Sequence, residues 1–307
     1  MHPLATRYPS VCARRGIELR TTSDEVLQGE FASFCHEFRD GIAQRCAVRA
    51  TQTNEVGRCA AIRPALAWLA LRGHRSIGLL DAGCSAGLNL FVDAYGYNLG
   101  GHAAGSPGAV PMLTCELRGA VPPLELPAIT HRVGLDLSPI DVTDDDGVAW
   151  LLACLWPDDL DRFERLAAAV DVVGSRRDEL RIVRGDMVDA LEEAASLAEG
   201  AEQLVVLDCW STAYLPPARR GAFADAVASL ALHRPVSWVT LEFPSVARDL
   251  GVLPDGADPT RTDASVVCVT EFDGAARRSM VLGHTHHHGA WLDWAAAAPP
   301  SARGASL

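Results

Sequence analysis

One glycine-rich stretch combines the residue types that bind an anionic cofactor group. Leu79–Asn89 contains an apolar run, then a carboxylate, then a loop of small residues. Glycines let backbone N–H groups approach a ligand, and the N-terminus of a following helix favours negative charge. We expect this loop to bind the methionine carboxylate of S-adenosylmethionine, although any tight strand-to-helix turn also uses glycine for packing. The candidate ligands are Asp81, Gly83, Ser85, Gly87 and Asn89.

Three later apolar runs also end in carboxylates. The first ends in Asp136 and Leu137, where two acceptor oxygens can receive both ribose hydroxyls. The second ends in Asp186 and Met187, where a side chain and a backbone N–H can bind an adenine edge. The third places Asp208 opposite the reactive methyl group. Each aspartate alone could cap a helix or lie at the surface, but their order favours one cofactor crevice at the carboxyl ends of parallel strands.

The elements that must position these residues follow an α/β pattern. Short β-rich runs alternate with helical segments, which indicates a sheet with crossover helices. We expect a Rossmann-like class I methyltransferase fold with a mostly parallel seven-stranded sheet. Strands are predicted at 77–80, 131–137, 180–184, 204–207, 236–242 and 265–272, with a last strand and turn within 280–294. Helices are predicted at 23–48, 60–71, 144–155, 158–172, 189–198 and 218–232.

The chain divides into three predicted parts. Residues 1–75 are expected to form an N-terminal helical lid or substrate segment, and residues 76–296 the S-adenosylmethionine-binding α/β domain. Residues 297–307 are rich in Ala and Ser and are expected to form a flexible tail. Residues 97–130 are rich in Gly and Pro, so we expect a hairpin-like insertion there, after the first crossover helix.

Several of these motifs together resemble the DUF2332 family of bacterial proteins. The resemblance implies a methyltransferase-like fold but no settled reaction. Members usually have a longer N-terminal helical region and a His-Ser-Trp run where this chain has Asp208-Cys209-Trp210, which puts an inherited catalytic role there in doubt. The matching stretches are Thr53–Arg58, Ser85–Leu90, the Leu-Ser-Pro-Ile-Asp run after Asp136, Arg184–Asp186, Ala213–Pro216 and His288–Trp294.

Polar and aromatic residues outside the strand ends are further candidates. Asn54 and Arg58 are expected to hold the cofactor from the lid, with capping and ion pairing as an equal alternative. Trp210 and Tyr214 can line the space around the sulfonium, because a cation is attracted to an aromatic face. Alternatively, Trp210 and Tyr214 could be packing residues of the core without a role in function. We take Asp208 and Tyr214 as candidate catalytic residues.

A histidine cluster follows near the C-terminus. On a strand, His284, His286 and His288 would share one face, and three imidazoles can bind zinc. No matching Cys, Asp or Glu spacing completes such a site, so we expect no metal. A single imidazole, His286 or His288, is better suited to act as a general base because its ordinary pKa is near neutrality. His288 is the candidate that we carry forward.

Composition limits the partners. The net charge is −12 and no Lys/Arg cluster is visible, so a small-molecule substrate is expected rather than nucleic acid. No apolar run is long enough to span a bilayer and no signal-peptide pattern begins the chain, which predicts a cytoplasmic location and no membrane partner. The nine cysteines show no Cys-x-x-Cys pair and indicate neither a disulfide framework nor a zinc ribbon. The composition does not decide whether the chain forms a homodimer.

Three functions fit these features. The first is methyl transfer from S-adenosylmethionine to an O or N atom of a small molecule. The second is cyclisation or elimination within the aminobutyryl chain of the cofactor, which releases methylthioadenosine. The third is a catalytically silent nucleoside-binding protein. The acceptor is not encoded in any portable motif, because substrate contacts in this fold come from lids and insertions.

Overall fold

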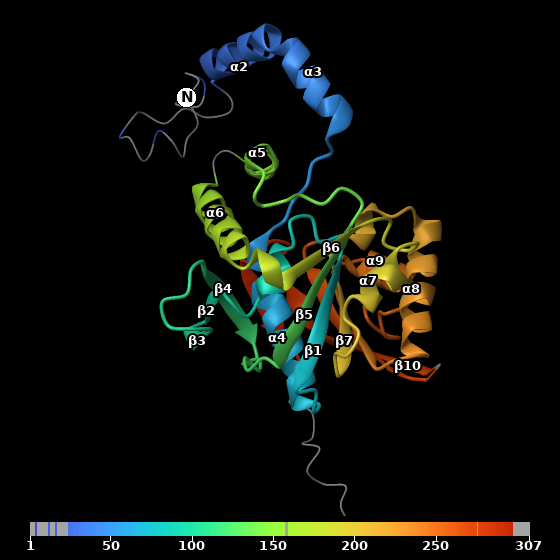
Figure 1. The fold of residues 1–307 in the computed structure, drawn as a ribbon. Coiled ribbons are helices and arrows are strands. Elements are labelled where there is room, and N and C mark those ends of the chain that lie inside the picture. Colours follow the sequence, from blue (N-terminus) through green and yellow to red (C-terminus); the bar gives the residue numbers. More distant parts are fainter. Residues whose placement is uncertain are drawn as a thin grey trace, which may run out of the picture.

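The computed structural model describes residues 4, 12, 16, 24–156, 159–274 and 276–296, and in that part of the chain it has an α/β fold around one mixed sheet of 11 strands (Figure 1). The α/β class is confirmed, but the expected seven-stranded, mostly parallel sheet is wrong. The strand order is β3-β2-β4-β11-β10-β9-β8-β7-β1-β5-β6. The bounds are β1 Ser76–Ala82, β2 Gly96–Leu99, β3 His102–Ala104, β4 Met112–Gly119, β5 Ala128–Asp136, β6 Leu180–Arg184, β7 Gln203–Cys209, β8 Val236–Glu242, β9 Ser265–Asp273, β10 Ala276–Thr285 and β11 Trp291–Trp294.

Five neighbouring strands, in the order β8-β7-β1-β5-β6, are parallel. Every residue of β7 and β8 is buried, which is typical of parallel strands covered on both faces. Among these five strands, the chain adds β5 and β6 on one side of β1 and later adds β7 and β8 on its other side. The direction of strand order therefore reverses between β1 and β7, and ligands bind at such a switch point in open α/β sheets.

The other six strands extend the sheet beyond β8 and explain the miscount. β9, β10 and β11 continue it as an antiparallel meander, and β4 then pairs in parallel with β11. β4 also pairs in parallel with β2. The predicted insertion 97–130 contains the antiparallel hairpin of β2 and β3, and its longest strand, β4, lies between β11 and β2 in the common sheet. In β4 the side chains of Leu113 and Cys115 are buried and those of Met112 and Thr114 are exposed, as the pleat requires.

Helices cover both faces of the sheet (Figure 1). The helices α4 and α6 pack in one core cluster, and α7, α8 and α9 pack in the other. The predicted helix at 23–48 is divided at Phe38 into α2 and α3, which lie away from the sheet in Figure 1. The bounds are α2 Glu25–Glu37, α3 Arg39–Val48, α4 Cys59–Leu71, α5 Asp145–Ala153, α6 Leu160–Ser175, α7 Leu191–Ser196, α8 Pro217–Ala231 and α9 Pro244–Asp249; the short 3₁₀ turns are η2 Val56–Arg58, η3 Leu88–Phe91, η4 Arg177–Glu179 and η5 Thr212–Tyr214.

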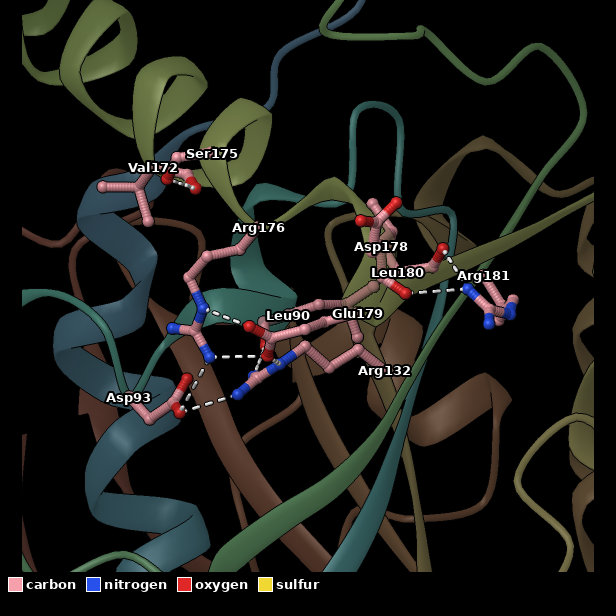
Figure 2. A network of polar contacts seen from close by, with 10 residues as sticks. All are labelled: Leu90, Asp93, Arg132, Val172, Ser175, Arg176, Asp178, Glu179, Leu180 and Arg181. Atoms are coloured by element: carbon pink, nitrogen blue, oxygen red, sulfur yellow. Dashed lines mark hydrogen bonds and ion pairs between the residues drawn. The ribbon is translucent and has the colours of Figure 1, made fainter.

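The expected first crossover helix is absent, since only the 3₁₀ turn η3 follows the glycine-rich loop. A polar network shown in Figure 2 holds this turn in place. The buried guanidinium of Arg132 on β5 donates to the Leu90 carbonyl and pairs with Asp93 and Glu179. Arg176 binds the same Glu179 carboxylate at 2.6 Å. The network therefore fixes the loop after β1 to β5 and to the end of α6.

The expected tail at 297–307 lies outside the described residues. Much of the predicted lid segment before residue 24 also lies outside them.

Candidate functional site

A cavity of about 310 Å³ lies at the carboxyl ends of the parallel strands, where the strand order reverses. Its wall is built from the loops that follow β1, β5, β6 and β7 and from the segment that precedes η2. The volume suits a small-molecule ligand. The lining residues are Ala50, Thr51, Gln52, Thr53, Asn54, Arg58, Gly83, Ser85, Asn89, Leu135, Asp136, Leu137, Ser138, Gly185, Asp186, Met187, Cys209, Trp210, Ser211, Tyr214 and Leu215. We call this space the cofactor cavity.

The glycine-rich loop makes its turn with left-handed backbone conformations. Gly83 has φ 90° and Gly87 has φ 74°, and Ser85 adopts φ 53° although it has a side chain. A Cβ atom on Gly83 would overlap the Cβ of Ser211, which belongs to the loop after β7. The two loops therefore meet closely only because residue 83 is glycine. Non-glycine residues with positive φ are uncommon and concentrate at functional sites.

Asp136 lies at the edge of the cofactor cavity and organises the glycine-rich loop. Its Oδ2 accepts the backbone N–H of Ser85 at 2.8 Å, and its Oδ1 accepts the backbone N–H of Ser138 at 2.8 Å. Each carboxylate oxygen has two lone pairs, so each can accept one more hydrogen bond. Asp136 can thus hold the loop and receive two ligand hydroxyls at the same time.

Asp186 occupies the end of β6 in a similar way. Its Oδ1 accepts the backbone N–H of Val188 at 2.8 Å and the guanidinium of Arg219 at 2.5 Å. Partial burial alone would raise the pKa of Asp186, but these hydrogen bonds and the charge of Arg219 lower it. The carboxylate is therefore ionised at neutral pH, and its other oxygen can accept a hydrogen bond from a ligand amine.

Residues 50–54 cross the cofactor cavity as a strap. The Gln52 side chain accepts from the Ser85 hydroxyl at 2.6 Å and donates to the Ser138 carbonyl at 2.8 Å. The Trp150 indole of α5 donates to the Ala50 carbonyl at 3.0 Å. Within the described part of the predicted lid, this strap and Arg58, rather than α2 and α3, contribute to the cavity wall.

Trp210 forms an aromatic wall of the cofactor cavity. Its φ is 59°, and its indole N–H donates to the Ser265 hydroxyl at 2.7 Å. The ring packs against Phe243 with a centroid distance of 4.4 Å. The Arg58 guanidinium lies 5.3 Å from the Trp210 ring centroid, and its Nε donates to the His287 carbonyl at 3.0 Å. Trp210 is therefore held on several sides, and one cation already lies over its ring.

Asp208 lies beneath the cofactor cavity and not in its wall. It is fully buried, and its Oδ2 accepts from the Trp238 indole at 2.5 Å and the Thr240 hydroxyl at 2.8 Å. Both partners lie on β8, on the face of the sheet that α8 covers. Burial, and next the charge of Glu242, raise the pKa of Asp208 well above its ordinary value.

Asp208 and Glu242 share the hydroxyl of Thr212. The hydroxyl oxygen lies 3.2 Å from Asp208 Oδ1 and 2.9 Å from Glu242 Oε1. A hydroxyl has one proton, so it can donate to only one of the two carboxyl groups. We infer that Asp208 is protonated and donates to the Thr212 oxygen, while Thr212 donates to Glu242. Glu242 also accepts the backbone N–H of Thr212 at 2.9 Å, so the pair fixes the turn η5 beside the cavity.

Asp81 is also buried behind the loop rather than exposed to the cofactor cavity. Its side chain is 1% exposed, and its Oδ2 has no hydrogen-bond partner among the described residues. Burial, and next the charge of Asp136, raise the pKa of Asp81 to about 7. Arg58 and the Asn89 amide act in the opposite direction. A buried carboxyl group with one unpaired oxygen thus lies behind the glycine-rich loop.

The cavity wall contains most but not all of the residues expected from the sequence. Asp81, Gly87, Asp208 and His288 do not line it. Gln52 and Ser211 do line it but were not expected. Gln52 directly precedes the motif at 53–58, whereas nothing in the sequence distinguished Ser211. The expected residues that line it are Asn54, Arg58, Gly83, Ser85, Asn89, Asp136, Leu137, Asp186, Met187, Trp210 and Tyr214.

His288 lies in a second cavity of about 290 Å³. β10 ends at Thr285, so the three histidines expected on one strand face do not lie on one strand, and His286 and His288 belong to the turn before β11. Burial, and next the charges of Arg162 and Arg58, lower the pKa of His288 to about 4. Its imidazole is therefore neutral at physiological pH. The second cavity is lined by Gly57, Leu113, Thr114, Asp159, Arg162, Arg165, His286, His288, Gly289 and Ala290.

Among the helices that the structure describes, none has the length and apolar character required to cross a membrane. A search of curated proteins finds no match.

Similar solved structures include TrmN from Thermus thermophilus, with 15% identity over 74% of this chain and a TM-score of 0.29. This chain spans about half (52%) of that structure. An S-adenosylmethionine-dependent methyltransferase from Clostridium acetobutylicum ATCC 824 matches with 11% identity over 82% of this chain and 78% of its own, also with a TM-score of 0.29. The model of one protein family, described as an uncharacterized protein conserved in bacteria (DUF2332), matches residues 1–294. The resemblance expected from the motifs is confirmed, and the chain belongs to the DUF2332 family.

Proposed function

We propose that this chain is an S-adenosylmethionine-dependent methyltransferase that acts on an O or N atom of a small molecule. The observation that carries the proposal is the cofactor cavity, in which a glycine-rich turn and two acidic strand ends meet at the switch point of the sheet. This is the place where open α/β sheets bind nucleotide-like ligands.

The residues present fit the proposed cofactor. Ser211 is 6% exposed, lines the cavity, and its hydroxyl has no hydrogen-bond partner among the described residues. A polar ligand would satisfy that hydroxyl. Asp136 would receive the ribose hydroxyls, and Asp186 with the backbone of Met187 would hold the adenine. The glycine-rich loop, whose residues Gly83, Ser85 and Asn89 line the cavity, would hold the methionine moiety.

When bound, S-adenosylmethionine supplies an electrophilic methyl group on a sulfonium. The residues of this chain would contribute alignment and exclusion of water, which can lower a barrier without a strong base. The strap at 50–54 would cover the ligand. Tyr214 is 76% exposed at the edge of the cavity, where its hydroxyl could orient the acceptor. Asp208 would act by positioning η5, because a buried protonated carboxyl cannot serve as a base.

Product analysis tests this proposal. The purified chain is incubated with S-adenosylmethionine, with and without a low-molecular-weight bacterial extract, and the nucleosides are identified by mass spectrometry. We expect S-adenosylhomocysteine only when the extract is present, and much less from an Asp136→Ala variant. Methylthioadenosine without extract would instead support cyclisation or elimination of the cofactor. Neither product, together with no binding of the nucleoside, would refute a cofactor function.

A further inference from the structure

The second cavity lies between α6 and the antiparallel part of the sheet. Arg162 and Arg165 come from α6, Thr114 from β4, and His286 and His288 from the turn between β10 and β11. β4 lies in the predicted insertion and the turn lies among the antiparallel strands, whereas α6 connects β5 to β6. Segments of this kind commonly carry ligand specificity on a shared fold.

A buried ion pair forms one side of this cavity. Glu55 is 3% exposed, and its carboxylate binds Arg162 Nε at 2.5 Å and Arg165 Nη2 at 3.4 Å. Burial alone would raise the pKa of Glu55, but the two guanidinium groups lower it. Arg162 is itself 7% exposed. One buried carboxylate is thus shared by two guanidinium groups, each of which has five N–H donors.

The hydrogen-bond inventory of the cavity favours an acceptor ligand. Arg165 Nε and His288 Nδ1 are buried and have no hydrogen-bond partner among the described residues. His286 Nδ1 accepts the backbone N–H of His288 at 3.1 Å, so the neutral ring carries its proton on Nε2 and presents a donor. Buried donors without partners are costly, and an oxyanion would satisfy several of them at once.

The local charge agrees with this inventory. The cations Arg162 and Arg58 affect the pKa of His288 more strongly than the anion Glu55 does. At His286 the charge of Glu55 has the larger effect and raises the pKa, against Arg118 and Arg162, so the cations dominate only on the His288 side of the cavity. Asp159, the other carboxylate in the lining, is 43% exposed and screened by water. A negative ligand group is favoured beside His288 and the two arginines of α6.

We infer that the second cavity binds a small organic acid through its carboxylate, with Arg165 and Arg162 as the guanidinium partners and His286 or His288 as a neutral donor. A planar carboxylate matches the fork of a guanidinium group. Binding at this site does not require the proposed cofactor, so it extends beyond the proposed function.

Only a thin wall separates the bound acid from the cofactor cavity. Gly57 lines the second cavity, and the next residue, Arg58, lines the cofactor cavity. A Cβ atom on Gly57 would overlap the carbonyl of His288, and one on Gly289 would overlap the carbonyl of Gly57. The two backbone segments touch because both residues are glycine. The organic acid therefore binds next to the loop that positions Arg58.

Acetate is the simplest probe for this site. The intact chain, with ¹³C-labelled histidine rings, is titrated with sodium acetate against sodium chloride at the same ionic strength, and the ring resonances are followed by NMR. We expect saturable shifts of the His286 and His288 signals, with half-saturation in the range of about 1–10 mM for so small a ligand. No saturable shift, or the same shift with chloride, would overturn the inference.

Variants of Arg165 identify the binding group. Arg165→Met keeps most of the stem and should weaken acetate binding about tenfold or more, and Arg165→Lys should weaken it less because the charge stays but the fork is lost. Arg181→Met, which removes an exposed arginine of β6 outside the cavity lining, is the matched control and should bind as the parent does. Unchanged binding by a folded Arg165→Met variant would overturn the assignment, as would a preference for inorganic phosphate over acetate. If the Arg165→Met variant does not fold, the acetate titration of the unsubstituted chain tests whether the second cavity binds a carboxylate.

Discussion

Replacing Asp81 by Asn is expected to change how the stability of the protein depends on pH. In the folded protein, burial keeps the proton on Asp81 up to a pKa of about 7, whereas in the unfolded chain the carboxyl ionises near 3.8. Between these values the folded state binds more protons than the unfolded state, so the free energy of unfolding falls as pH rises. An amide does not ionise, so the variant lacks this contribution.

The size of the effect follows from the two pKa values. The difference between 3.8 and about 7 corresponds to about 4 kcal/mol in total, of which about 3 kcal/mol falls between pH 5 and pH 8. The Asn variant should therefore gain about 3 kcal/mol relative to the parent across that interval, whatever constant cost the substitution carries.

Urea unfolding at several pH values from 5 to 8 measures this gain. The other titrating groups are common to both proteins and cancel in the difference. Asp225→Asn, which removes one exposed carboxylate from α8, is the matched control and should leave the pH dependence nearly unchanged. Parallel stability curves for the parent and the Asp81→Asn variant would show that Asp81 ionises normally in the folded state, and would refute the reasoning.

Three further outcomes are expected. Gly83→Ala should destabilise the protein by about 2 kcal/mol or more and abolish nucleoside binding in calorimetry, because the new Cβ overlaps the loop after β7 and φ is 90°. The control Gly174→Ala, on an open part of α6, should raise the free energy of unfolding by about 0.5–1 kcal/mol. Similar losses of stability at both positions would contradict the close approach of the two loops. Asp208→Asn should lower the free energy of unfolding by about 1 kcal/mol, since an amide can replace a protonated carboxyl. Asp208→Ala should lower it by several kcal/mol, since three polar side chains lose their partner. Equal losses in the two variants would show that Asp208 is ionised. Hydrogen bonding to Arg176 lowers the pKa of Glu179 to about 2, so its stabilisation is complete above pH 4.5 and is lost as pH falls toward 2. In thermal unfolding, Glu179→Gln should reduce the loss of stability between pH 4.5 and pH 2. The same loss in the variant and the parent would exclude the network as its cause.

The parallel half of the sheet could be predicted from the sequence because its signals are local. Short apolar and β-branched runs identify these strands, and those of β1, β5, β6 and β7 end at or beside a glycine or an aspartate. The first and last residues of β5, β6, β7 and β8 each lie within three residues of the predicted ones.

The arrangement of the six strands beyond β8 could not be predicted, because strand pairing is not a local property of the sequence. β4 pairs with β11, and the register joins Glu116 to Trp291, far along the chain. Alternation in the insertion identifies a strand but not its partner. The same limit applies to Asp208: its position at a strand end was visible, but the face on which it lies depends on its pairing with Thr240 of β8.

Isothermal titration of the intact chain with S-adenosylmethionine is the most direct test of the cofactor cavity. We predict one site per chain with micromolar affinity, and a loss of about tenfold or more on Asp136→Ala, which removes the ribose contacts. No heat of binding up to about 1 mM ligand, or the same affinity in the Asp136→Ala variant, would contradict the assignment of this cavity to the cofactor.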